Sequence, residues 1–180
     1  MSANPDDRLR LPPREPILNL PAAVVWLIAA LVLVQGAREF LDAYDDFVVM
    51  SWLAFVPARL SLWLEPERLN ELVQSLGTSG STEFGQRLQL IRLLLADGGP
   101  RLWTLVSYGL LHGSWLHLVS NVVWLAAFGS PVARRLGTAR FLNLMALSTI
   151  AGALLHWWSR ELDVLPLVGI SAGVSGATAA

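Results

Sequence analysis

Four long stretches of this chain contain no aspartate, glutamate, lysine or arginine, and they constrain its fold more than any other feature does. The stretches are residues 16–37, 102–133, 141–159 and 164–180. A helix needs about 20 predominantly apolar residues to cross the hydrocarbon core of a bilayer. The first three stretches are long enough, and the fourth approaches that length where the sequence ends. The pattern therefore predicts an all-α membrane protein, built as a multi-pass helical bundle.

The composition supports a membrane protein and excludes several other classes. Hydrophobic residues make up 54% of the 180 residues and charged residues 15%, whereas a soluble domain carries about 25% charged residues. The formal net charge of −1 offers no basic field to attract nucleic acid. We therefore expect the lipid bilayer, and not nucleic acid, as a partner. The absence of cysteine excludes a disulfide framework and a thiolate metal site.

The chain is predicted to divide into a polar N-terminal tail, residues 1–17, and a membrane domain, residues 18–180. Ser114 is a favourable N-cap within the second apolar stretch, and Pro166 is a favourable first-turn residue for the last one. The predicted membrane helices span about residues 18–35, 115–135, 141–158 and 166–180.

A long connection, residues 38–101, follows the first predicted membrane helix and holds two amphipathic segments, residues 47–64 and 84–96. The second segment carries Arg87 and Arg92 beside a leucine-rich face. It suits a helix that lies in the membrane interface, and equally a helix packed on the protein's own surface.

The positions of the arginines predict the orientation in the membrane. The tail and the short connection at residues 130–140 each contain three arginines, whereas residues 159–163 contain one arginine and two acids. Short arginine-rich connections stay in the cytoplasm. We therefore expect a cytoplasmic N-terminus, an outer loop at residues 38–101 and a location in the cell (inner) membrane.

Three polar side chains of the apolar stretches are predicted to reach a similar depth. His117 and Asn121 are four residues apart and so share one helix face. A rise of about 1.5 Å per residue puts Asn121 roughly 9 Å below Trp115, and Ser171 roughly 8 Å below Pro166. Polar groups within a bilayer normally face the protein interior or a water-filled cavity. The three side chains are therefore candidates for one polar site, although histidine and asparagine also bond neighbouring helices together.

A packing role for the last stretch is the alternative. Small residues recur at every fourth position, in two rows: Gly169, Gly173 and Ala177, and Ala172, Gly176 and Ala180. Such a pattern lets two helices approach closely without any catalysis.

Other catalytic chemistries do not fit the sequence. His112 and His117 are five residues apart and no H-E-x-x-H occurs, which disfavours a zinc protease, and we expect no metal site. The apolar stretches contain no aspartate, which disfavours a membrane aspartyl protease. Residues 169–173 match G-x-S-x-G, but a helical context lacks the strand that precedes such a nucleophile elbow, so we interpret the match as chance.

Three segments together resemble the rhomboid family of intramembrane serine proteases. They are residues 112–121 (HGSWLHLVSN), 129–137 (GSPVARRLG) and 169–176 (GISAGVSG), which agree in order and spacing as well as in letters. The resemblance extends from about residue 103 to the end. It implies a rhomboid-like bundle in which four of an expected six transmembrane helices are present. It also implies hydrolysis of peptide bonds in transmembrane protein substrates by a serine–histidine dyad, without a cofactor.

The resemblance also implies roles for individual residues. Ser171 resembles the nucleophile, and His117 and Asn121 resemble the pair that stabilises the oxyanion. Residues implied to support the site are His112, a structural histidine in the loop before the helix, Gly169 and Gly173.

A second serine competes with Ser171 for the role of nucleophile. Ser175 lies in a literal match to the family's short motif, whereas Ala172 replaces the glycine that usually follows the first serine. Ser175 is, however, one helical turn too deep, so the resemblance favours Ser171.

Three further departures concern the loops and the dyad. Ala133 stands where the family usually has an acid, and Trp103-Thr104 stands where it usually has Trp-Arg. The family's catalytic histidine lies on its sixth helix, and His156, on the third predicted helix, is not placed to replace it. We therefore expect these 180 residues by themselves to be inactive as a protease.

Two other functions fit the same residues. A catalytically inactive rhomboid-like protein would bind client transmembrane helices. An unrelated multi-pass scaffold would use its small residues for packing alone. The sequence carries no signal for a particular oligomeric state.

Overall fold

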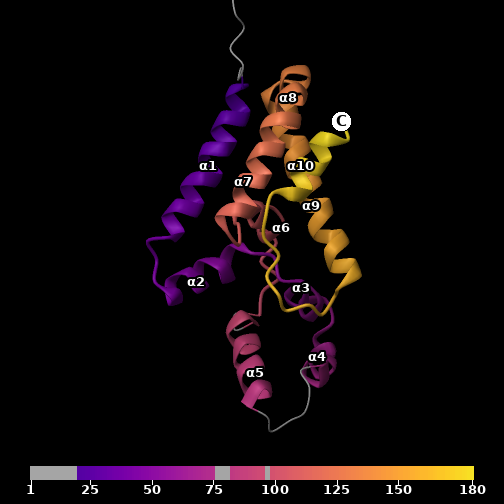
Figure 1. Cartoon of the computed structure of the whole chain (residues 1–180). Helices are drawn as coiled ribbons and strands as arrows, with labels where there is room; N and C mark the ends of the chain where they lie inside the picture. The colour runs from indigo at the N-terminus through magenta and orange to yellow at the C-terminus, as the bar shows by residue number, and fades with distance from the viewer. Residues whose placement is uncertain (1–19, 76–81, 96–97) are drawn as a thin grey trace, which may run out of the picture.

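The computed structural model describes residues 20–75, 82–95 and 98–180. The regular elements within these ranges are helices, and one isolated β-bridge joins Phe55 to Leu167. Figure 1 shows one bundle of helices above and a second group of helices below. The prediction of an all-α fold is confirmed.

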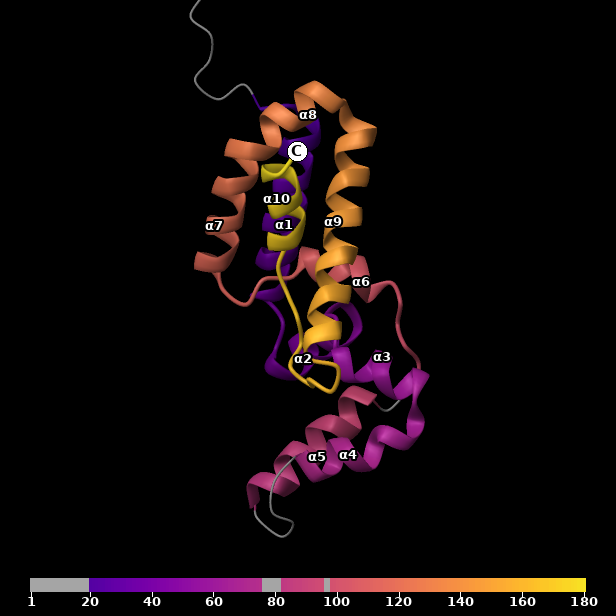
Figure 2. The same cartoon turned by 90° about the vertical axis from the view of Figure 1, so that its right-hand side faces the viewer.

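The bundle combines helices from both ends of the chain. α1 (Ala22–Arg38), α7 (Trp115–Trp124) and α9 (Thr138–Ser159) form its long sides, and α10 (Ser171–Thr178) lies between α7 and α9 (Figures 1 and 2). α7 continues through the π-helical segment η4 (Leu125–Gly129) into α8 (Ser130–Leu136). Gly137, with a φ of 77°, then turns the chain into α9. The buried core of the bundle consists of Ala23, Val24, Leu31, Leu118, Leu125, Ala133, Phe141, Met145, Ile170, Val174 and Ala177.

Two helices in the described part of the chain are long and apolar enough to cross a membrane. They are the continuous helix Trp115–Leu136 and α9, with 22 residues each. α1 is also apolar but has 17 residues. The predicted tail, residues 1–17, and the predicted start of the first helix at residue 18 lie outside the described residues.

The last helix begins at Ser171, so the predicted start at residue 166 is wrong. Leu167 is in extended backbone, where its N–H donates to the Phe55 carbonyl at 2.8 Å and its carbonyl accepts from the Phe55 N–H at 3.3 Å. Gly169 follows with a φ of 113°, and its N–H donates to the carbonyl of Tyr108 at 3.0 Å. These backbone hydrogen bonds to distant residues replace the helical ones that Pro166 would have favoured.

One face of α10 packs tightly on α9. A Cβ atom on Gly173 would lie 2.9 Å from Met145 Cε and 3.2 Å from the Met145 carbonyl oxygen. A Cβ atom on Gly176 would clash with the side chain of Ser148. The small residues of this stretch therefore serve close helix packing, as their spacing indicated. Ser171 and Ser175 are exposed on the remaining surface of α10.

The connection at residues 38–101 consists of α2 (Ala43–Leu53), α3 (Pro57–Leu64), η2 (Pro66–Arg68), α4 (Leu69–Ser75) and α5 (Thr82–Leu95). The predicted amphipathic segment 47–64 is thus interrupted between α2 and α3. Val56, with φ −115° and ψ 109°, is extended because a residue that precedes proline is disfavoured in a helix.

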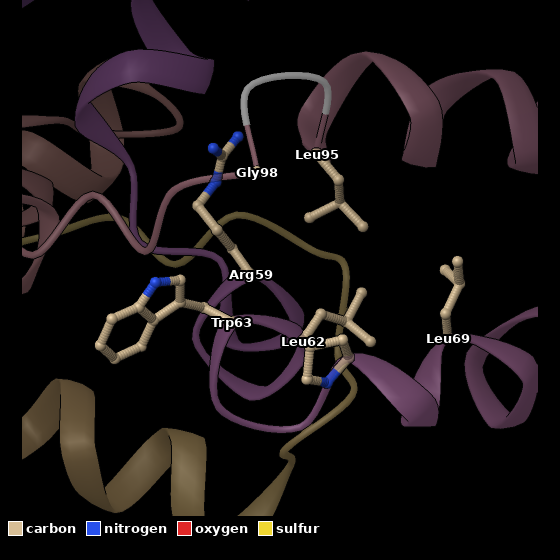
Figure 3. Close-up of a pocket in the computed structure, with 7 residues that line it drawn as sticks. Arg59, Leu62, Trp63, Leu69, Leu95 and Gly98 are labelled. Atoms are coloured by element: carbon tan, nitrogen blue, oxygen red, sulfur yellow. The ribbon is translucent and has the colours of Figure 1, made fainter.

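The described part of the apolar face of α5 packs on the protein itself. Ile91 is buried with Val56, Ala58 and Leu72, and Leu88 is half-buried against the same cluster. Of the two predicted settings for this amphipathic helix, the contacts of this face therefore favour the protein surface. A cavity of ≈ 210 Å³ lies between α3, α4 and α5 and is lined by Arg59, Leu62, Trp63, Pro66, Leu69, Leu95 and Gly98. Figure 3 shows this cavity with six of the lining residues labelled. The described residues that line it include no nucleophile and no carboxylate.

A cation–π cluster anchors the connection to the segment before α7. The Arg101 guanidinium lies 4.0 Å from the centre of the Trp52 ring, and Trp103 Nε1 donates to the Trp52 carbonyl at 2.8 Å. Ser107 Oγ donates to the Leu53 carbonyl, also at 2.8 Å. The chain therefore has an arginine–tryptophan anchor here although Thr104 follows Trp103.

Candidate active site

A cavity of ≈ 450 Å³ lies between α7 and α10. It is lined by His117, Ser120, Asn121 and Trp124 from α7 and by Ser171, Val174, Ser175 and Thr178 from α10. The structure therefore brings Ser171, His117 and Asn121 to one cavity.

The start of α7 positions the two residues of this helix. Ser114 is extended, with φ −163° and ψ 161°, and its side chain accepts a hydrogen bond from the His117 N–H at 3.2 Å. It is the N-cap, and α7 begins at Trp115. His117 and Asn121 then follow one another by about one turn, because a helix has 3.6 residues per turn. The side chain of Asn121 is buried, and its Nδ2 has no hydrogen-bond partner among the described residues.

Gly169 lets the backbone before α10 approach the His117 ring. A Cβ atom at this position would lie 2.7 Å from His117 Cε1, 2.8 Å from Nε2 and 3.8 Å from Asn121 Nδ2. Its φ of 113° is also one that residues with a side chain rarely adopt. Both observations require glycine two residues before Ser171.

Ser171 is exposed at the first position of α10. The first N–H groups of a helix have no carbonyl partner within it, and the partial charge at that end is positive. Ser175 lines the same cavity about one turn further along. The serine hydroxyl of Ser171 is therefore close to backbone donors as well as to the cavity.

His112 lies behind His117 and does not line the cavity. The two rings meet edge to face, with 5.0 Å between their centres. His112 is fully buried, and neither ring nitrogen has a hydrogen-bond partner in the structure as described. Burial lowers the pKa of His112 to about 4, and the neighbouring His117 and Arg38 act in the same direction. The ring is therefore neutral at physiological pH and contributes packing to the site.

Two other residues considered in the sequence analysis, Gly173 and His156, do not line the cavity. Gly173 faces α9 and acts through helix packing. His156 is half-buried in the last turn of α9 and is not among the residues that line the cavity. Among the described residues, no group of three histidine, aspartate or glutamate side chains is arranged to hold a metal ion.

Sequence analysis missed several lining residues that its own spacing rule identifies. Ser120 and Trp124 are three and seven residues after His117, and Val174 and Thr178 are three and seven residues after Ser171. Positions three, four and seven residues apart share a helix face. The signal was therefore present in the sequence once both helices were placed.

Comparison with known proteins identifies the family. The family model described as Rhomboid domain matches residues 99–180, which include α7, α10 and the whole cavity. Residues 99–180 of the chain match the rhomboid domain family. This match and the two apolar helices point to an integral membrane protein with a multi-pass helical fold.

Several curated rhomboid proteins are similar to the chain. Rhomboid protein 1, mitochondrial, of Saccharomyces cerevisiae is 36% identical over 90 residues, which are 50% of this chain and 26% of the yeast protein. RHOMBOID-like protein 5 of Arabidopsis thaliana is 26% identical over 175 residues, covering 92% of this chain and 53% of its own length. Rhomboid protease GlpG of Pectobacterium atrosepticum is 28% identical over 137 residues, covering 76% of this chain and 33% of its own length.

The chain thus spans about a quarter to a half of the length of these relatives. No solved structure is significantly similar to it.

Proposed function

We propose that this chain is part of an intramembrane serine endopeptidase that cleaves peptide bonds of membrane-embedded substrate helices. Ser171 is the nucleophile, and His117 and Asn121 stabilise the oxyanion. The observation that carries the proposal is that these three residues line one cavity between α7 and α10. The similarity to a rhomboid protease, GlpG, supports the same reaction.

The chemistry follows from the positions of the donors. Ser171 Oγ attacks the carbonyl carbon of the scissile bond, and the carbonyl oxygen becomes an oxyanion. Asn121 Nδ2 is a donor without a competing partner, the His117 ring provides a second donor, and the backbone N–H of Ser171 provides a third. Loss of one such donor typically lowers the rate by about 10²–10³-fold.

The Ser171 proton needs a general base within hydrogen-bond reach. Among the histidines of this chain, His117 is assigned to the oxyanion, His112 is buried behind it, and His156 lies away from the cavity. The proposal therefore assigns the base to a histidine of the longer protein, and proteolysis to that protein and not to these 180 residues alone.

The proposal includes an orientation in the cell (inner) membrane. Arg134, Arg135 and Arg140 are exposed where α8 turns into α9, and Trp158 is exposed at the opposite end of α9. An arginine-rich turn suits the cytoplasmic side, and an aromatic residue suits the other interface. The N-terminus is then cytoplasmic, and the cavity opens near the outer side, where water has access.

A fluorophosphonate probe, which reacts with activated serines, tests the proposal. The full-length protein in bilayers is expected to be labelled, Ser175→Ala is expected to retain labelling, and Ser171→Ala is expected to lose it. Labelling that survives in Ser171→Ala and disappears in Ser175→Ala would reverse the assignment. A full-length protein that neither reacts nor cleaves any transmembrane substrate would instead indicate an inactive, client-binding relative.

A further inference from the structure

The last residue of α1 joins three separate segments of the chain. Arg38 Nε donates to Asp46 Oδ1 at 2.7 Å, and Nη2 donates to Asp46 Oδ2 at 3.0 Å, so α1 and α2 are joined by a two-point ion pair. Nη1 donates to the carbonyl oxygen of His112 at 2.8 Å. The Arg38 side chain is 12% exposed and the Asp46 side chain 34% exposed, so the guanidinium is the shielded partner of this pair.

This geometry depends on the guanidinium group. A planar fork with several donors can hold a carboxylate at two points and still direct another N–H to a carbonyl, which a lysine ammonium cannot reproduce. Hydrogen bonds between ionised partners are also about twice as strong as neutral ones. The two-point geometry and the shielded guanidinium distinguish the Arg38–Asp46 pair from a single-contact surface ion pair, which contributes little.

The segment that Arg38 holds leads directly to the proposed active site. His112 packs edge to face on His117, and Ser114 caps α7 at the His117 N–H. Next to the cap, Trp115 Nε1 donates to Glu39 Oε1 at 3.0 Å. The end of α1 therefore contacts the start of α7 at a second point. The contacts thus run without interruption from Arg38 to the ring of His117.

The ring of His117 in turn has little freedom on its other side. The backbone of Gly169 lies so close that a Cβ atom there would be 2.8 Å from His117 Nε2. A shift of the turn at residues 112–114 would therefore move the ring against this backbone or out of the cavity.

We propose that Arg38 is a positioning residue for His117. Its guanidinium fixes the turn before α7 and thereby holds the imidazole in the cavity beside Ser171. The effect of Arg38 on catalysis rests on the proposed protease function, whereas its effect on the position of His117 does not.

The test compares Arg38→Met, Arg38→Lys and Asp46→Asn in the full-length protein. Arg140→Met is the matched control, because Arg140 is exposed at the other end of the bundle. Histidine-selective ¹⁵N NMR reports the ring of His117, whose resonances are assigned by their disappearance in His117→Gln. Fluorophosphonate labelling measures the reactivity of Ser171, and substrate cleavage measures kcat and KM.

Arg38→Met is expected to shift the His117 ring resonances and to lower kcat by about 10- to 100-fold with KM changed less than about twofold, as for a misplaced catalytic group. Asp46→Asn retains the bond from Arg38 to the His112 carbonyl, so its kcat is expected to fall less than that of Arg38→Met. Arg38→Lys, which keeps the charge but not the fork, is expected to be intermediate. Arg140→Met is expected to match the wild type in all measurements.

His117 resonances and a kcat that are the same in Arg38→Met and Arg140→Met would overturn the proposal. If Arg38→Met does not fold, wild-type resonances and kcat in Arg38→Lys overturn it instead. If Ser171 is never labelled, the proposed protease function fails, and the NMR comparison still decides whether Arg38 positions His117.

Discussion

Replacing Gly169 by alanine tests the contact on which the geometry of the cavity depends. The added Cβ atom would lie 2.7 Å and 2.8 Å from two atoms of the His117 ring, and the backbone has a φ of 113°. A residue with a side chain in such a backbone conformation costs about 1–3 kcal/mol. Forcing a methyl group into filled space costs about 1–3 kcal/mol more. If His117 keeps its place, the free energy of unfolding is expected to fall by roughly 2–6 kcal/mol.

The protein can relieve the second of these costs by moving the His117 ring out of the cavity. It then loses the proposed oxyanion donor, and labelling and cleavage are expected to fall by about 10²–10³-fold. The assay therefore measures both quantities in the full-length protein, thermal unfolding in detergent and the rate of fluorophosphonate labelling. Gly36→Ala is the matched control, because a Cβ atom there meets nothing within 4 Å. Gly169→Ala with the stability and labelling rate of Gly36→Ala would refute the reasoning.

Two further predictions concern buried polar groups of the same region. Asn121→Ala is expected to lower cleavage by about 10²–10³-fold with little change in the melting temperature, because its Nδ2 has no partner to lose; a large fall in melting temperature with unchanged cleavage would show that Asn121 only joins helices. The lowered pKa of His112 means that the unfolded chain binds a proton more readily than the folded one. The stability from this residue is therefore complete above about pH 6.5 and is lost progressively as the pH falls towards 4. The loss is about 3 kcal/mol at most. Unfolding measured between pH 7.5 and pH 4.5 checks this, and His112→Phe is expected to flatten the profile.

Local patterns predicted the parts of the site that local interactions determine. The spacing of His117 and Asn121, and Ser114 as a cap, depend on residues within one turn of a helix, so the sequence was sufficient for them. The start of α10 was mispredicted because Pro166 is a local helix signal, whereas Leu167 pairs with Phe55, more than a hundred residues earlier. Contacts of such separation leave no periodic trace in the sequence.

The cation–π contact of Arg101 was not predicted for the same reason, because it joins residues that are far apart in the sequence. Its partner Trp52 belongs to α2, and no short motif joins the two. The break between α2 and α3 is different, because a local signal marks it: the residue before Pro57 disfavours a continuous helix, although the amphipathic pattern continues across it. Fold class and candidate nucleophile were thus accessible from the sequence, whereas the long-range contacts that orient them were not.

The glycines between α9 and α10 have a consequence for how a substrate is handled. Because Gly173 and Gly176 leave no gap against Met145 and Ser148, the helix that carries Ser171 cannot rotate or slide without a steric collision. The backbone of Ser171 is therefore held in place, and if Ser171 is the nucleophile, as we propose, a substrate polypeptide has to unwind and bring its own carbonyl carbon to that position.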